Sequence, residues 1–358
     1  MNQENLIPVV NSFNEWDPLE EVIVGRADFA CVPDWHITLE ATIPPQHWNW
    51  FKQNAGKPFP KELLLAVNQE LDNLSAILEA EGVVVRRPDP VDWSQSYNTP
   101  DFNTVRGLYG AMPRDFLLVI GNELIEAPMA WRSRYFEFRA YRSLIKEYFR
   151  QGAQWTAAPK PQMSDDLYKE DLSNEGISQE ATVLTEFEPV FDAAEFSRCG
   201  KDIFCQVSQV TNRFGIEWLQ RHLGDNYQVH ILDFNDPHAM HIDSTFVPLA
   251  PGKLLINPTR SLGLPSLFKS WDILTPPESS TPDSHPLYFS SKWISMNLLS
   301  LDEERVLVEK QEEPTIKFLK DSGFKPIPVP LRNFGSLGGS FHCATCDIRR
   351  RGKLESYF

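Results

Sequence analysis

The stretch Leu63–Pro88, LLLAVNQELDNLSAILEAEGVVVRRP, contains the pattern that decides the fold. Its first part repeats apolar residues every three or four positions, which predicts an amphipathic helix. Gly82 ends this pattern, and the β-branched run Val83–Val85 predicts a short strand before Pro88. The residues at helical spacing are Leu63, Leu64, Val67, Leu71, Leu74, Ile77 and Leu78. The stretch therefore predicts a unit of one helix followed by one strand.

The same unit recurs four more times along the chain. The apolar positions of these copies are Tyr148-Phe149 with Trp155, Trp218-Leu219 with Val229–Leu232, Leu267-Phe268 with Ile273-Leu274, and Ile316–Leu319 with Ile327 and Val329. Other strand-like runs lie between the units, namely Val22–Val24, Phe116–Ile120, Cys205–Val210, Leu254–Ile256 and Val306–Val308. Five such units without a linker predict an α/β fold in which residues 1–358 form a single closed domain with pseudo-fivefold symmetry. A doubly wound α/β sheet is the competing interpretation, and the lack of a G-x-G-x-x-G turn and of a G-x-x-x-x-G-K-[ST] loop argues against it.

The composition indicates a soluble protein without a nucleic-acid partner. The chain has 358 residues, of which 42% are hydrophobic, enough to bury a large core. Its 34 basic and 49 acidic residues give a formal charge of -15, so no basic surface is expected for a phosphate backbone. The apolar runs are far shorter than the roughly 20 residues that a bilayer span needs. The polar N-terminus Met1–Asn5 lacks the pattern of a secretory signal, so we expect a cytoplasmic protein that does not enter a membrane.

A glycine-rich turn near the C-terminus contains Cys343 and Cys346, two of the five cysteines. An odd number of cysteines in a long chain argues against a disulfide framework. Gly338 and Gly339 allow a close approach of the backbone, and a cysteine after such a turn can be exposed in a pocket as a nucleophile. The alternatives are a buried structural cysteine, a redox pair of Cys343 with Cys346, and half of a zinc site, for which the chain offers no second C-x-x-C.

The segment Met240–Phe246 offers a base for this thiol. If the segment forms a strand, His241 and Asp243 lie on one face, because side chains alternate along a strand. A histidine close to a cysteine can activate the thiol by taking its proton. For the segment taken alone, a surface histidine beside a solvated aspartate is the alternative.

Two further carboxylates lie next to apolar runs, where a polar side chain is costly. Asp192 follows one such run, and Asp115 opens the expected strand Phe116–Ile120. Each can be a turn cap or an ion-pair partner, but several carboxylates aimed into one cavity would bind a planar guanidinium. Arg260 can grip a substrate carboxylate or form a surface ion pair. The basic run Arg349–Arg351 is interpreted as a solvated or dimer-contact patch.

Four motifs occur in order along the chain: Phe191–Ala194, Met240–Asp243, Ser290–Trp293 and Gly338–Cys343. Together they resemble the arginine:glycine amidinotransferase family, and the likeness runs from residue 11 to residue 352. The resemblance implies the pentein-like, five-bladed α/β propeller that this family shares with arginine deiminases, in agreement with the five units. It also implies a homodimer and a transferase that needs neither a metal nor an organic cofactor.

The resemblance further implies a role for each matching residue. Cys343 is then the nucleophile, His241 the general acid and base, and Asp192 the carboxylate that orients His241. The remaining positions are Asp115 and Asp243 for the guanidinium of L-arginine, Arg260, Ser290 and Ser291 for its α-carboxylate and amine, Met240 and His238 beside the acceptor, and Cys346 as a structural residue. In the implied ping-pong mechanism the thiolate attacks the guanidino carbon, ornithine leaves, and a thiouronium-type intermediate passes its amidino group to an amine.

The acceptor amine is the open point of this resemblance. Glycine-using members commonly have Asp-Pro-Asn-Pro-Met where this chain has Asp236–Met240, with His238 and Ala239 in the middle. Met240 is retained, which favours glycine or a related small amine as acceptor and a guanidinoacetate-type product. A secondary-metabolite amidinotransferase with another acceptor is the alternative.

Three other functions stay open at this point. The same side chains would make an arginine deiminase-type hydrolase, with citrulline as product, if water resolves the covalent intermediate. A non-catalytic module that binds arginine-like ligands would require an unactivated Cys343. A redox protein would use Cys343 together with Cys346.

Overall fold

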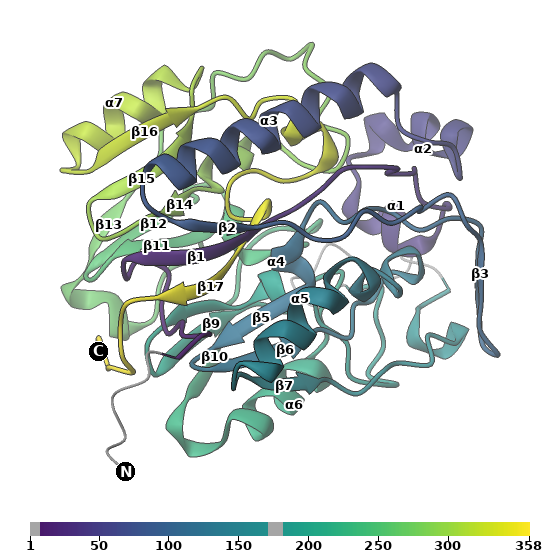
Figure 1. The fold of residues 1–358 in the computed structure, drawn as a ribbon, viewed down its shortest axis with the longest axis horizontal. Coiled ribbons are helices and arrows are strands. Elements are labelled where there is room, and N and C mark those ends of the chain that lie inside the picture. Colours follow the sequence, from purple (N-terminus) through teal and green to yellow (C-terminus); the bar gives the residue numbers. More distant parts are fainter. Residues whose placement is uncertain (1–7, 171–181) are drawn as a thin grey trace.

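Most strands of the computed structural model lie in five three-stranded sheets that share one topology (Figure 1). The structure describes residues 8–170 and 182–358. In each of these sheets the middle strand runs antiparallel to one neighbour and parallel to the other. The predicted five-bladed α/β architecture is therefore confirmed within the described residues. The extension of a single domain over all of residues 1–358 stays a prediction.

Four of the sheets are built from consecutive strands. They contain β5 (Leu117–Ile120), β6 (Glu123–Glu126) and β7 (Gln154–Ala157); β8 (Ser197–Cys199), β9 (Asp202–Cys205) and β10 (Gln228–Ile231); β11 (Phe246–Ala250), β12 (Lys253–Ile256) and β13 (Asp272–Leu274); and β14 (Leu299–Ser300), β15 (Arg305–Glu309) and β16 (Lys325–Val329). A separate hairpin pairs β3 (Tyr97–Asn98) with β4 (Asn103–Thr104).

The remaining three-stranded sheet joins distant parts of the chain. It contains β1 (Leu19–Val24), β2 (Val84–Arg86) and β17 (Thr345–Arg350). β17 pairs antiparallel with β1, and Figure 1 shows this yellow strand beside the purple one. This pairing holds the segment just before β17, where Cys343 lies, inside the molecule.

Helices connect the two parallel strands of each sheet, because parallel neighbours need a crossover. The crossover helices are α3 (Lys61–Ala80), α5 (Phe138–Arg150), α6 (Arg213–Leu223), the 3-10 helix η7 (Ser266–Ser270) and α7 (Glu313–Asp321). The other helices are α1 (Ile37–Thr42), α2 (Trp48–Asn54), α4 (Pro113–Phe116), η1 (Pro45–His47), η2 (Arg132–Arg134), η3 (Asp165–Leu167), η4 (Ala193–Glu195), η5 (Gly224–Asn226), η6 (Ile242–Ser244), η8 (Lys292–Met296) and η9 (Phe334–Leu337). The expected amphipathic helix at Leu267-Phe268 is thus only a short 3-10 turn, since Gly263 and Pro265 break the segment before it.

Three expectations for local structure are wrong. The run Cys205–Val210 is not a strand, because β9 ends at Cys205. Asp115 does not open a strand but lies in α4, which Pro113 begins at the first helical position, and β5 starts at Leu117. His241 and Asp243 do not alternate along a strand, since His241 precedes the 3-10 helix η6, which contains Asp243.

The expectation of a solvated basic run is wrong for Arg350. Its side chain is fully buried on β17, donates from Nε to Asp347 Oδ2 at 2.6 Å, and donates from Nη2 to the backbone oxygen of Ser300 at 2.9 Å. Asp347 also pairs with the buried Arg114 and Arg198. Burial alone would raise the pKa of Asp347, but the surrounding guanidinium groups hold it well below its usual range. A charged network therefore lies inside the fold, where the sequence pattern suggested surface.

Candidate active site

The nucleophile turn, defined here as residues 338–343, is shaped by its two glycines. Gly338 has a φ of +99°, a left-handed conformation that favours glycine. A Cβ on Gly339 would lie 2.6 Å from Met112 Sδ and 2.7 Å from Cys343 Cβ. Glycine at both positions is what lets the backbone fold tightly against the cysteine, and β17 begins directly after this turn.

A cavity of about 150 Å³ opens onto Cys343. Eight of the ten residues predicted for the site line it: His238, Met240, His241, Asp243, Arg260, Ser290, Ser291 and Cys343. Asp115 and Asp192 are buried beside His241. The structure thus brings all ten residues together, although they come from segments that are far apart in the sequence.

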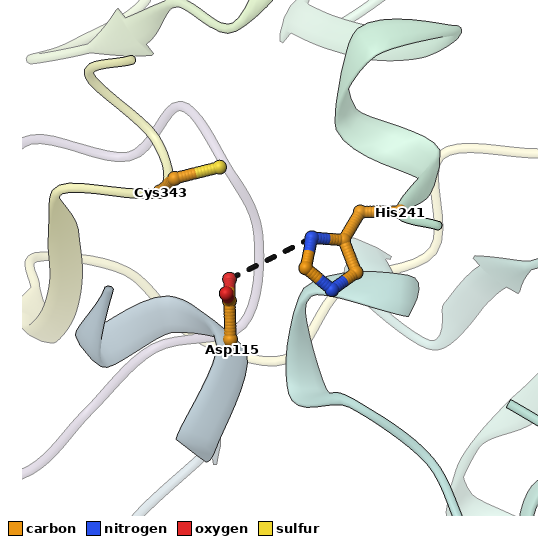
Figure 2. A group of neighbouring side chains, drawn as sticks. All are labelled: Asp115, His241 and Cys343. Atoms are coloured by element: carbon orange, nitrogen blue, oxygen red, sulfur yellow. Dashed lines mark ion pairs between the residues drawn. The ribbon is translucent and has the colours of Figure 1, made fainter. Parts of the chain in front are cut away.

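Two carboxylates hold the imidazole of His241. Its Nε2 lies 3.0 Å from Asp192 Oδ2, and its Nδ1 lies 3.7 Å from Asp115 Oδ1. Figure 2 shows His241 and Cys343 reaching from opposite sides toward the space above Asp115. Burial would lower the pKa of His241, but the charges of Asp115 and Asp192 raise it well above its usual value. These charges therefore favour the imidazolium form of His241, which can give a proton.

Arg134 contacts both of these carboxylates, and the sequence analysis did not predict it. This buried side chain of η2 donates from Nη1 to Asp115 Oδ2 at 2.8 Å and lies 3.5 Å from Asp192 Oδ2. Glu137 binds its other edge through two hydrogen bonds of 2.9 Å. Asp115 Oδ1 and Asp192 Oδ1 are buried without a hydrogen-bond partner.

Asp243 approaches the sulfur from the other side and is itself held by a second histidine. Its Oδ2 lies 3.5 Å from Cys343 Sγ and 2.7 Å from His342 Nδ1. The Nε2 of His342 lies 3.3 Å from Glu15 Oε2. An imidazole between two carboxylates donates from both nitrogens, and the pKa of His342 is raised accordingly against the effect of burial.

Burial and the nearby charge of Asp243 raise the pKa of Cys343 to about 12, although the hydrogen bond and the charge of His241 act to lower it. The resting side chain is therefore a neutral thiol. A guanidinium beside Asp115 and Asp243 would offset their charges and favour the thiolate. The site is thus arranged to activate its sulfur when a cation binds.

Arg260 also lines the cavity and is held by several polar side chains. Its Nη1 donates to Ser244 Oγ at 3.1 Å and to Thr245 Oγ1 at 3.0 Å, and its Nε lies 3.0 Å from Asp236 Oδ2. Nearby, Ser290 Oγ is buried without a partner. A guanidinium and an unpaired hydroxyl suit the carboxylate and amine of an amino acid.

Two alternatives for this site are a metal centre and a redox pair of cysteines. Asp115, His241 and Cys343 place possible metal-ligand atoms within 4.8 Å of one another in the described part of the chain. The expectation of a metal-free site stays a prediction. Cys343 and Cys346 pack in different hydrophobic clusters, and Cys346 Sγ lies 3.5 Å from the backbone oxygen of Leu117, which argues against a redox pair.

Among the described residues, no helix has the length and apolar character needed to span a membrane. No model of a known protein family matches the sequence.

Individual proteins similar to this chain are amidinotransferases. The L-arginine:L-lysine amidinotransferase of Pseudomonas savastanoi pv. phaseolicola is 58% identical over 349 residues, covering 97% of this chain and 96% of that protein. The mitochondrial glycine amidinotransferase of Gallus gallus is 52% identical over 358 aligned residues, covering 98% of this chain and 85% of that protein.

Solved structures agree with this similarity. SxtG, an amidinotransferase from Microseira wollei in the saxitoxin biosynthetic pathway, superposes with a TM-score of 0.91 and 52% identity, covering 98% of this chain and 100% of that one. The N-terminal domain of ArgZ, a cyanobacterial arginine dihydrolase, has a TM-score of 0.60 at 14% identity over 92% of this chain and 98% of that one. The second likeness is one of fold alone.

Proposed function

This chain belongs to the amidinotransferase family of transferases, and we propose that Cys343 carries the amidino group of L-arginine between the donor and an acceptor amine. The observation that carries the proposal is the meeting of Asp115, His241 and Cys343 within 4.8 Å, beside a cavity that Arg260 also lines.

In the first half-reaction the guanidinium of arginine lies between Asp115 and Asp243, and its α-carboxylate binds Arg260 with Ser290 and Ser291. The positive charge lowers the pKa of the sulfur, so the thiol loses its proton to solvent when arginine binds, and the resulting thiolate attacks the guanidino carbon. The bond from this carbon to the δ-nitrogen breaks, and His241, oriented by Asp192, donates a proton to that nitrogen. Ornithine leaves, and the amidino group stays on sulfur.

In the second half-reaction the acceptor amine attacks the same carbon. His241 now takes the proton of the amine, the carbon–sulfur bond breaks, and the Cys343 thiolate is restored. Asp115 and Asp243 stabilise the positive charge on the amidino nitrogens throughout. The two half-reactions predict ping-pong kinetics without a cofactor.

Two acceptors have specific support. The retained Met240 in the cavity wall favours glycine or a similar small amine. The 58% identical relative named for arginine and lysine favours lysine. The departure from the glycine-type motif at His238, whose Nδ1 lies 2.7 Å from the backbone oxygen of Ala41, argues against glycine. We place both acceptors ahead of the secondary-metabolite alternative. The cytoplasmic location and the homodimer expected from the sequence belong to the same proposal.

The test is mass spectrometry of the purified protein with arginine, first alone and then with glycine, lysine or a panel of other amines. Ornithine together with a guanidinylated amine would support the transfer, and the amine consumed fastest identifies the acceptor. Citrulline formed without dependence on an amine would instead indicate a hydrolase. Unchanged arginine would favour a binding module.

A further inference from the structure

Asn297 lies beside the nucleophile and was not among the residues predicted from the sequence. It follows η8 directly and is fully buried. Its Nδ2 donates to Cys343 Sγ at 3.3 Å, and its Oδ1 accepts from the backbone N–H groups of Ser340 and Cys343, both at 3.1 Å. One side chain therefore holds the backbone and the sulfur of the nucleophile together.

The amide of Asn297 has one workable orientation. Reversing it would turn its NH2 group toward the N–H groups of Ser340 and Cys343 and leave these buried donors without acceptors, which is costly inside a protein. The backbone oxygen of Asn297 also accepts from Phe341 N at 3.1 Å, which ties the two segments further. An N–H group consequently points at the sulfur at every pH.

The charged groups around the sulfur act in opposite directions. Asp243, 3.5 Å away, and Asp115 oppose negative charge on the sulfur, whereas His241 favours it. His342 Nδ1 lies 2.7 Å from Asp243 Oδ2, the same oxygen that lies near the sulfur. Asn297 is a neutral donor whose hydrogen bond becomes charge-assisted, and about twice as strong, once the thiol loses its proton.

We propose that Asn297 is a catalytic residue whose amide N–H stabilises the Cys343 thiolate, both before attack and when the carbon–sulfur bond breaks. The proposal rests on the proposed function in taking Cys343 as the nucleophile. It adds no step to that reaction, because Asn297 neither gives nor takes a proton.

The experiment measures how fast iodoacetamide alkylates Cys343 as a function of pH, with peptide mapping to separate this thiol from the other four. Asn297→Asp keeps an oxygen for the two backbone N–H groups but presents a carboxylate oxygen to the sulfur. Asn14→Asp is the matched control, because Asn14 is also fully buried, accepts from two backbone N–H groups through Oδ1, and donates from Nδ2 to Tyr357 Oη.

Asn297→Asp should slow alkylation at neutral pH by at least about tenfold, since one pKa unit is tenfold in thiolate. Asn14→Asp should match the unsubstituted protein. If Asn297→Asp does not fold, Asn297→Ser removes the amide without adding charge and should also slow alkylation. An unchanged profile for a folded Asn297 variant, or an equal shift in Asn14→Asp, would overturn the proposal. Alkylation needs no substrate, so failure of arginine turnover in the unsubstituted protein is a separate result.

Discussion

Replacing Asp192 by asparagine tests how far one carboxylate controls the acid at this site. The change keeps the shape of the side chain but removes the charge that lies 3.0 Å from His241 Nε2. A nearby opposite charge is worth about 1 to 3 pKa units, and one unit is about 1.4 kcal/mol, so the imidazolium should lose about 1.4 to 4 kcal/mol of stabilisation. The pKa of His241 should fall by the same number of units.

The sign of the effect follows from the direction of the shift. The pKa of His241 is raised in the folded protein, so the protonated form that serves the leaving amine persists into the alkaline range. In Asp192→Asn the protonated form of His241 should be lost at a lower pH than in the unsubstituted protein. The alkaline limb of ornithine release should therefore move toward acid by about 1 to 3 units, and the rate above it should fall by about 10- to 1,000-fold.

The assay is single-turnover release of ornithine, without an acceptor, across neutral and alkaline pH. Asp202→Asn is the matched control, because Asp202 Oδ1 lies 2.7 Å from His230 Nε2 in a similar pair outside the cavity. Its profile should equal that of the unsubstituted protein. An alkaline limb that stays in place in Asp192→Asn, or moves as much in Asp202→Asn, would refute the reasoning.

Three further changes test other parts of the site. Cys343→Ala should lower ornithine release by about 10⁴-fold or more while the unfolding midpoint stays near that of the unsubstituted protein, and a variant with most of its activity would exclude Cys343 as nucleophile. Gly339→Ala should lower kcat by more than about tenfold, because its Cβ would meet Met112 Sδ at 2.6 Å and displace the nucleophile; steady-state kinetics of the folded variant would show this loss. Cys346→Ala should keep the transfer rate within about twofold and lower stability by about 1 kcal/mol in urea unfolding, whereas loss of turnover in a folded protein would favour the redox interpretation.

The fold was predictable where local pattern and tertiary structure agree. The spacing of apolar residues in Leu63–Pro88 predicts a helix with one apolar face and a following strand, and α3 and β2 form there. The pattern failed at η6, where a single 3-10 turn replaces the strand expected at His241 and Asp243. His241 precedes η6 with an extended backbone, and both it and Asp243 line one cavity, so the residues were found although the element was wrong.

The residues that sequence reasoning missed are buried polar groups whose partners are distant in the chain. Arg134 and Glu137 have helical spacing that could have suggested a pair, but nothing local indicates that Asp115 shares it. In the sequence Asn297 resembles any loop asparagine, and only the folded structure shows its contact with Cys343. Arg350 looks solvated because its neighbours in the sequence are basic, but Asp347 and the backbone oxygen of Ser300 bind it in the interior.

The pairing of β17 with β1 has a consequence for protein synthesis. Cys343 is held in place by Thr345–Arg350, the strand that completes the sheet begun by Leu19–Val24. When the other four sheets have been synthesised, β17 has not yet emerged from the ribosome. One edge of β1 therefore stays unpaired through most of the elongation of the chain. That edge must be protected from other chains until Thr345–Arg350 emerges.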